Sequence, residues 1–325
     1  MSTNGVVEVL NALPISKLIS TVSAGIGKMY EPHHKRKMAD ATAYEINVIG
    51  EAMRNAADLP IVYNENGVVI NSEDFTRLMQ RAGTRMVLQE TIKQHNIERV
   101  VDNAYDILEN EETCSEDPVE QGWINRFFDS VADISDEDLQ KLWGKVLAGE
   151  IKQPKSYSLR ALETLKNLSK NEAELFQHIA PYIISTNDLS FLSNNTEIKK
   201  QFNILDGDYI QLASCGLLQM IPFTEINTSV LPHKTQRNFL TETRLLSITN
   251  NTSSEQNLKI KEIYLLTSAG KELFNLLAFI PNNEYFEKWV RITHRSNNEL
   301  LFTVHEKAEN KTKEYKVNPL ISLGE

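Results

Sequence analysis

The chain has 325 residues, of which 41% are hydrophobic and 24% are charged, and its formal net charge is −10. This length and composition predict an ordinary globular protein of two or three domains, and the negative charge argues against coating of nucleic acid by bulk electrostatics. The two cysteines, Cys114 and Cys215, have no Cys or His cluster beside them, which argues against a disulfide framework or a zinc site.

Residues 1–59 are predicted to form an amphipathic helical arm. Its apolar side chains fall on one helical face, and we expect them to be the contact residues of the arm: Ile15, Leu18, Ile19, Val22, Ile26 and Met29. A basic cluster follows, in which Lys35, Arg36 and Lys37 are candidates for binding phosphate or lipid headgroups.

Two interpretations of the arm stay open. We favour assembly of its apolar face into a helical bundle, which predicts a homo-oligomer, over contact with a membrane surface. No cleavable secretory signal is seen, because charged residues and Pro14 interrupt the apolar N-terminal stretch. The expected location is therefore cytoplasmic, with the inner membrane as a peripheral site if the arm binds lipid.

Residues 60–108 are predicted as a long helical segment, in which Ser72 and Asp74 offer N-terminal caps and Gly83 marks a bend. Residues 109–121 are rich in Glu and Asp and are predicted as a solvated linker. A metal-binding loop is the disfavoured alternative, since the acids lack the spacing of a calcium loop.

Residues 122–184 are predicted as a helical core block of three helices. The predicted caps are Ser135 for the first helix, Ser158 for the second, and a capping box of Ser169 with Glu172 for the third. Trp143 lies in the apolar stripe of the first helix and is predicted to be a core residue.

Residues 185–280 follow the order of a winged helix, with helices expected at 197–204 and 206–218 and strands at 244–248 and 260–266. Residues 281–325 are predicted as a β-containing tail, hairpin-like over 291–317. The expected fold class is thus mostly α, with helical N-terminal and central modules and a winged-helix-like α+β C-terminal domain.

A basic set near the predicted wing, Lys234, Arg237 and Arg244, is the candidate contact for nucleic acid or a protein partner. The helix that would read the major groove carries Asp206 and Asp208 and no Lys or Arg. We therefore favour a protein partner, and nucleic acid is disfavoured.

The stretch from Gly122 to Phe176 resembles the bacterial family catalogued as domain of unknown function 2806. The residues that carry the resemblance are Leu142, Trp143, Leu147, Ala148, Gly149, Glu150, Pro154, Ser156 and Leu162. The resemblance extends over most of the chain up to about Phe286 and implies no catalytic residue. It suggests antiviral defence by association only.

No phosphate-cradling loop, nucleophile elbow or His-Glu-x-x-His helix is present in the sequence. We therefore expect a non-enzymatic interaction protein without a cofactor, in which the helical arm drives assembly. The alternative is a nucleic-acid-binding regulator that uses the winged-helix-like domain. A hydrolase whose active site is assembled from distant residues is a third interpretation.

Overall fold

The computed structural model describes residues 13–26, 72–220, 226–307, 315 and 321–323. It divides the chain into two compact units, residues 1–162 and residues 163–325. The predicted arm, long helix, acidic segment and first core helices fall together in unit 1, and the predicted core block is divided between the units. Met29 and the basic cluster at 35–37 lie outside the described residues.

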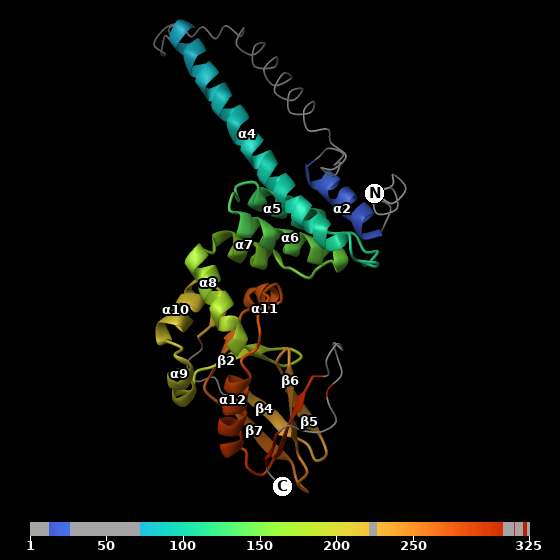
Figure 1. The fold of residues 1–325 in the computed structure, drawn as a ribbon, viewed down its shortest axis with the longest axis vertical. Coiled ribbons are helices and arrows are strands. Elements are labelled where there is room, and N and C mark those ends of the chain that lie inside the picture. The colour runs from blue at the N-terminus through green and yellow to red at the C-terminus, as the bar shows by residue number, and fades with distance from the viewer. Residues whose placement is uncertain (1–12, 27–71, 221–225, 308–314, 316–320, 324–325) are drawn as a thin grey trace, which may run out of the picture. The chain divides into compact units, whose positions relative to one another are not determined.

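Unit 1 is helical (Figure 1). Its described elements are α2 (Leu13–Ile26), α4 (Ser72–Leu108), α5 (Gln121–Val131), α6 (Glu137–Lys152) and the first part of α7 (Leu159–Asn167). The centre of its core holds Phe127 and Trp143, whose rings meet edge to face with centroids 5.5 Å apart. Trp143 is fully buried, which confirms the predicted core position.

The long helix α4 confirms the predicted helical segment and stays helical through Gly83. Its C-terminal half packs on α6 and buries Val100, Ala104 and Leu108. The two helices approach closely at Gly144, where an added Cβ would lie 2.5 Å from the Cβ of Asn103. Among the described residues, the N-terminal half of α4 keeps Leu88 and Ile92 exposed.

The acidic segment between α4 and α5 is held against the helices of unit 1 and is not a free linker. Ser115 donates its backbone N–H to the carbonyl of Lys152, 2.8 Å away, and its own carbonyl accepts from Lys17 Nζ, also at 2.8 Å. Glu111 forms an ion pair with Lys152. These bonds explain why so polar a segment is ordered: each satisfies a backbone or charged group in place of water.

Two of the three caps predicted for the core block are confirmed, and one is wrong. Ser169 and Glu172 form the predicted capping box of α8, and Ser158 accepts from the backbone of Ala161. The cap of α6, however, is Asp136 and not Ser135, since its carboxylate accepts from the backbone N–H groups of residues 138 and 139 at 3.0 Å. A carboxylate at this position also faces the positive end of the helix dipole.

Unit 2 is built on an antiparallel sheet of eight strands in the order β10-β9-β6-β5-β1-β2-β8-β3, and β4 pairs with β7 in a separate ribbon. The strands are β1 (Ile184–Ser185), β2 (Ser190–Ser193), β3 (Leu218–Gln219), β4 (Ile226–Leu231), β5 (Gln236–Leu240), β6 (Arg244–Thr249), β7 (Gln256–Ile260), β8 (Ile263–Leu266), β9 (Leu301–Glu306) and β10 (Ile321–Leu323). The helices are the rest of α7, α8 (Lys170–Ile179), the short 3₁₀ helix η2 (Ala180–Tyr182), α9 (Thr196–Phe202), α10 (Asp206–Ser214), α11 (Ser268–Phe274) and α12 (Asn283–Arg295).

The core of unit 2 forms where α12 meets the sheet. Trp289 packs its ring against Phe191 of β2 and Phe239 of β5, with centroid distances of 5.5 Å and 5.3 Å. The hairpin predicted over 291–317 is wrong at its start, because α12 continues to Arg295. Apolar positions spaced for this helical face were mistaken for strand alternation.

The structure confirms a mostly helical chain and adds a larger sheet in its C-terminal half than the sequence predicted. The predicted strand at 244–248 is β6, whereas the predicted run at 260–266 is two strands, β7 and β8, separated by a turn. Glu262 in that turn has a φ of 53°, a left-handed conformation that ends one strand before the next begins.

Candidate functional site

The predicted contact face of the N-terminal arm is largely internal. Ile15, Leu18 and Val22 are fully buried where α2 packs against α5 and α6 of the same unit, and Ile19 is half-buried. The side chain of Ile26 is outside the described residues. The expectation of a free apolar arm is thus corrected: its periodicity reflects packing on the chain's own core.

A close approach at the end of α2 shows how tight this packing is. A Cβ added to Gly25 would lie 2.2 Å from the ring of Phe128 on α5. Release of the arm to reach a membrane or a second chain would therefore expose the core of unit 1. Within the described residues, no helix combines the length and the apolar character needed to cross a bilayer.

The three cations predicted near the wing do not form one patch. Lys234 is exposed in the turn before β5, and Arg237 is exposed on β5, opposite Ile248 of β6. Arg244 begins β6, about 13 Å along the strand from Ile248, and its guanidinium forms an ion pair with Glu287 of α12. Only 12% of the Arg244 side chain is exposed, so its charge pairs with Glu287 inside the protein and is not presented to a partner.

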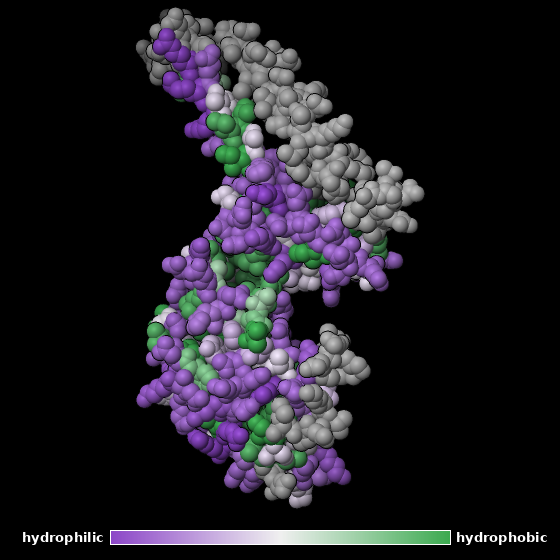
Figure 2. Space-filling view, in the orientation of Figure 1, coloured by the Kyte–Doolittle hydropathy of each residue, from purple (hydrophilic) through white to green (hydrophobic). Residues whose placement is uncertain are grey.

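Among the residues that the structure describes, the largest group of exposed apolar side chains on a single element lies on the N-terminal half of α4. Figure 2 shows apolar surface gathered on this half of the helix between hydrophilic stretches. The exposed apolar residues are Leu78, Met79, Met86, Leu88 and Ile92. Leu88 and Ile92 keep 59% and 57% of their surface exposed, so neither is a core residue of the described structure.

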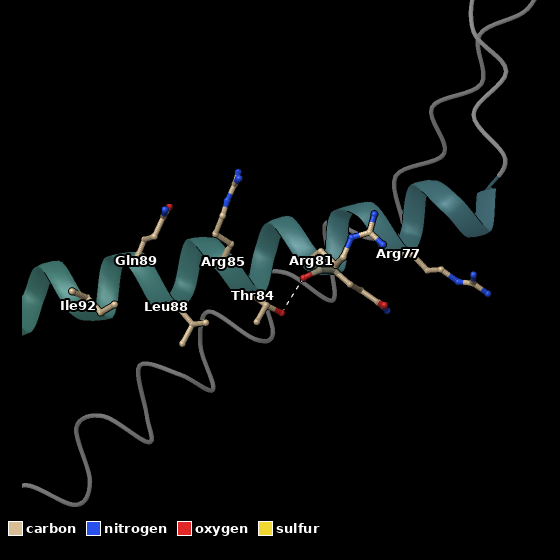
Figure 3. A pocket seen from close by; sticks show the side chains of 8 residues that line it. Arg77, Arg81, Thr84, Arg85, Leu88, Gln89 and Ile92 are labelled. Carbon is tan, nitrogen blue, oxygen red and sulfur yellow. Dashed lines mark hydrogen bonds between the residues drawn. The ribbon is translucent and has the colours of Figure 1, made fainter.

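Three arginines share one face of α4 with Leu88 and Ile92. Arg77, Arg81 and Arg85 are all exposed and follow one another at four-residue spacing, which places them along one side of a helix. Figure 3 shows them with Leu88 and Ile92 along the same stretch of helix. We call this face, from Arg77 to Ile92, the arginine stripe.

Two buried tyrosines of unit 2 have raised pKa values that are explained by their place in the fold. In unit 2, Tyr209 Oη donates to the carbonyl of Ser193 at 2.6 Å, and Tyr285 Oη accepts from the backbone N–H of Ser193 at 2.9 Å. Burial raises the pKa of both tyrosines, so both phenols stay protonated and act as hydrogen-bonding partners of β2. Within the described part of the chain, no group of three His, Cys, Asp or Glu side chains is arranged to hold a metal ion.

The arginine stripe was missed in the sequence because apolar residues recur along the whole of α4, and periodicity does not reveal where a covering helix ends. Leu88 in fact lies on the side of the helix opposite the buried Ala104. The signal that could have revealed it was the run of three arginines without an intervening acid, since a helix face buried in the core carries no such charges.

One of three comparisons with known proteins agrees with the family resemblance seen in the sequence. No match was found among curated proteins or among solved structures. The family model described as "Protein of unknown function (DUF2806)" matches residues 80–289, which include most of α4 and all of α5 to α11. This match spans more than half of the chain, and the chain therefore belongs to the DUF2806 family of proteins of unknown function.

Proposed function

We propose that this chain is a non-enzymatic interaction protein that assembles through the exposed N-terminal half of α4. The observation that carries the proposal is the exposure of Leu88 and Ile92 beside Arg81 and Arg85 on a helix whose other half is packed in a core. Figure 1 shows this half of α4 extending beyond α5 and α6.

A helix half that projects into water lacks the packing that stabilises most helices in proteins. Helical structure in proteins is stabilised mainly by packing of an apolar face, because propensity alone is marginal. The projecting half of α4 contains Gly83 and several β-branched residues, which weaken the helix further. A partner that covers Leu88 and Ile92 would supply the missing packing and remove apolar surface from water.

The solution mass of the full chain tests this proposal. Light scattering after gel filtration should give a multiple of the 37.0 kDa chain mass, and Leu88→Asp with Ile92→Asp should reduce it to one chain. The matched control is Ile280→Asp between α11 and α12, which changes an apolar side chain that is 86% exposed and lies outside α4. A single-chain mass for the unaltered protein, or an oligomer that survives the double substitution, would refute the proposal.

We also propose that the winged-helix-like part, residues 185–280, contacts protein and not nucleic acid. The support is that α10 exposes Leu205 and Ile210 beside Asp206 and Asp208, so the helix in the reading position presents apolar and acidic side chains. Acidic groups repel phosphate. Salt-dependent binding of duplex DNA that is weakened by Lys234→Ala with Arg237→Ala would instead support the nucleic-acid alternative.

The membrane and defence hypotheses have less support than assembly. Burial of Ile15, Leu18 and Val22 removes three of the apolar side chains on which lipid contact by the arm depended. A cytoplasmic location and a role in antiviral defence stay predictions. Cell fractionation tests the location. Phage plating efficiency tests the role in defence, compared between cells that carry the unaltered chain, the Leu88→Asp/Ile92→Asp chain or neither.

A further inference from the structure

A cleft in unit 1 lies between α2 and the segment that leads from α4 into α5. Its volume is about 530 Å³, which is within the usual range for sites that bind small molecules. Side chains of α2 line one wall, and Ser115, Glu116 and the first turn of α5 line the other. None of the described residues that line it belongs to α4, so this site is separate from the proposed assembly surface.

Lys17 places a positive charge on the α2 wall of the cleft. Its side chain is half-buried, and Nζ donates to the backbone carbonyl of Ser115 at 2.8 Å. This bond fixes the position of the ammonium and uses one of its three N–H groups. Among the described residues Lys17 forms no ion pair, so two donors and the charge are available to a ligand in the cleft.

Thr21 lies one helical turn after Lys17 and lines the same cleft. Only 6% of the residue is exposed, and its hydroxyl has no hydrogen-bond partner among the described residues. A buried hydroxyl without a partner destabilises a fold, because the hydrogen bonds that it made to water are not replaced. A ligand oxygen in the cleft would supply the missing partner.

The N-terminal end of α5 adds a second positive element at the opposite wall. Gln121 and Ile124, both in its first turn, line the cleft. The N-cap residue, Glu120, makes no side-chain hydrogen bond to this end, so the first backbone N–H groups have no side-chain acceptor within the described part of the chain. Free N–H groups at a helix N-terminus favour an anion. Lys17, Thr21 and this helix end therefore favour an anionic group of a ligand.

A carboxylate and an apolar surface limit which anion can bind. Glu116 lines the cleft and is exposed, and the exposed Asp117 follows it. Two acids at this wall repel a polyanion such as a phosphate ester, whereas Glu116 attracts an ammonium group. The buried side chains of Val119 and Ile124 add apolar surface to the lining. The ligand that fits all of these groups carries one carboxylate, one ammonium and an apolar side chain.

We propose that this cleft binds a free α-amino acid with an apolar side chain. The carboxylate is held by Lys17, the Thr21 hydroxyl and the N-terminal end of α5, and the ammonium is held by Glu116. The apolar side chain packs against Val119 and Ile124. Each charged group of the ligand is then matched by an opposite charge of the protein, which offsets the loss of water on binding.

Isothermal titration of the full chain with L-leucine tests the ligand class. We expect saturable binding of one leucine per chain. Isoamylamine lacks the carboxylate of leucine, and isocaproate lacks its ammonium. Each should bind at least about 10-fold more weakly than leucine, because each leaves one charged group of the cleft without a partner.

Thr21→Val tests the buried hydroxyl, since it keeps the shape of the side chain and removes only the polar group. The dissociation constant for L-leucine should rise about 5- to 10-fold. The urea midpoint of the ligand-free chain should not fall, because the hydroxyl has no partner to lose. A purely structural role would give the reverse, a lower midpoint and an unchanged dissociation constant.

Lys17→Met tests the charge and should raise the dissociation constant about 10- to 100-fold. Lys17→Arg keeps the charge and should retain most of the affinity, which separates loss of the charge from any loosening of the acidic segment. The matched control is Lys141→Met on α6, an exposed lysine outside the cleft. This control should leave the dissociation constant unchanged.

The inference would be overturned if a chain that circular dichroism shows to be folded gave no heat of binding with L-leucine up to about 10 mM. Equal affinities for leucine and isocaproate would also overturn it, as would an unchanged dissociation constant in both Thr21→Val and Lys17→Met. Displacement of leucine by a lower concentration of inorganic phosphate would overturn it in favour of a phosphate ligand. None of these results bears on assembly through α4, which the solution mass tests separately.

Discussion

At the scale of single residues, Glu150 shows how a buried charge can organise a turn. Its side chain is almost fully buried, and its two carboxylate oxygens accept from the backbone N–H groups of Lys155 at 2.6 Å and Tyr157 at 3.1 Å. Lys155 has a φ of 71°, a strained conformation for a residue with a side chain. The carboxylate therefore fixes the connection between α6 and α7.

Glu150→Ala should destabilise the protein by about 2–4 kcal/mol, because it leaves two backbone donors in a poorly hydrated turn without acceptors. Glu150→Gln, which retains one oxygen acceptor, should have a smaller effect. Denaturant unfolding monitored by circular dichroism measures both. The control is Glu116→Gln at an exposed position of the acidic segment, and equal stabilities for all three variants would contradict this role.

At the scale of single elements, α8 begins with a capping box whose strength depends on pH. Glu172 accepts from both the backbone N–H and the hydroxyl of Ser169 at 2.7 Å, and these hydrogen bonds hold the pKa of its carboxyl below the ordinary value. A lowered pKa in the folded state means that the stabilisation is complete above the unfolded-state pKa. It is lost as the pH falls through the folded-state pKa.

The stability difference between the unaltered chain and Glu172→Gln should therefore be largest near neutral pH and shrink toward about pH 3. Gln keeps a capping oxygen without a titrating charge, which isolates the pH-dependent part. Urea midpoints measured across this range provide the comparison. A difference that stays constant with pH would show that the Glu172 charge does not contribute to the cap.

The elements that could be predicted from the sequence are those fixed by local signals. The C-terminal end of α4 at Leu108 and the capping box at Ser169 follow from residues close together in the chain, and both are confirmed. The order of the eight-stranded sheet is different in kind, since it joins β6 to β9 and β1 to β5 across long separations. Short strands such as β1 and β3, with two residues each, leave no alternation to detect.

At the scale of the whole molecule, the sequence assigned an exposed apolar face to the arm, whereas the described structure has such a face on α4. The apolar face of α2 is buried in its own unit, whereas the open face belongs to the half of α4 that α6 does not cover. Both helices show the same periodicity, so only the three-dimensional packing distinguishes them. The net charge of −10 also hid the local excess of arginine on α4.

Hydrogen exchange of the α4 backbone amides, compared at low and high protein concentration, tests the central claim most directly. If copies of the chain assemble through this helix, residues 77–92 should exchange more slowly as concentration rises. The Leu88→Asp/Ile92→Asp chain should show no such change, and α12 should exchange equally in all samples because its face is already buried. Exchange over residues 77–92 that is independent of concentration in the unaltered chain would contradict assembly through α4.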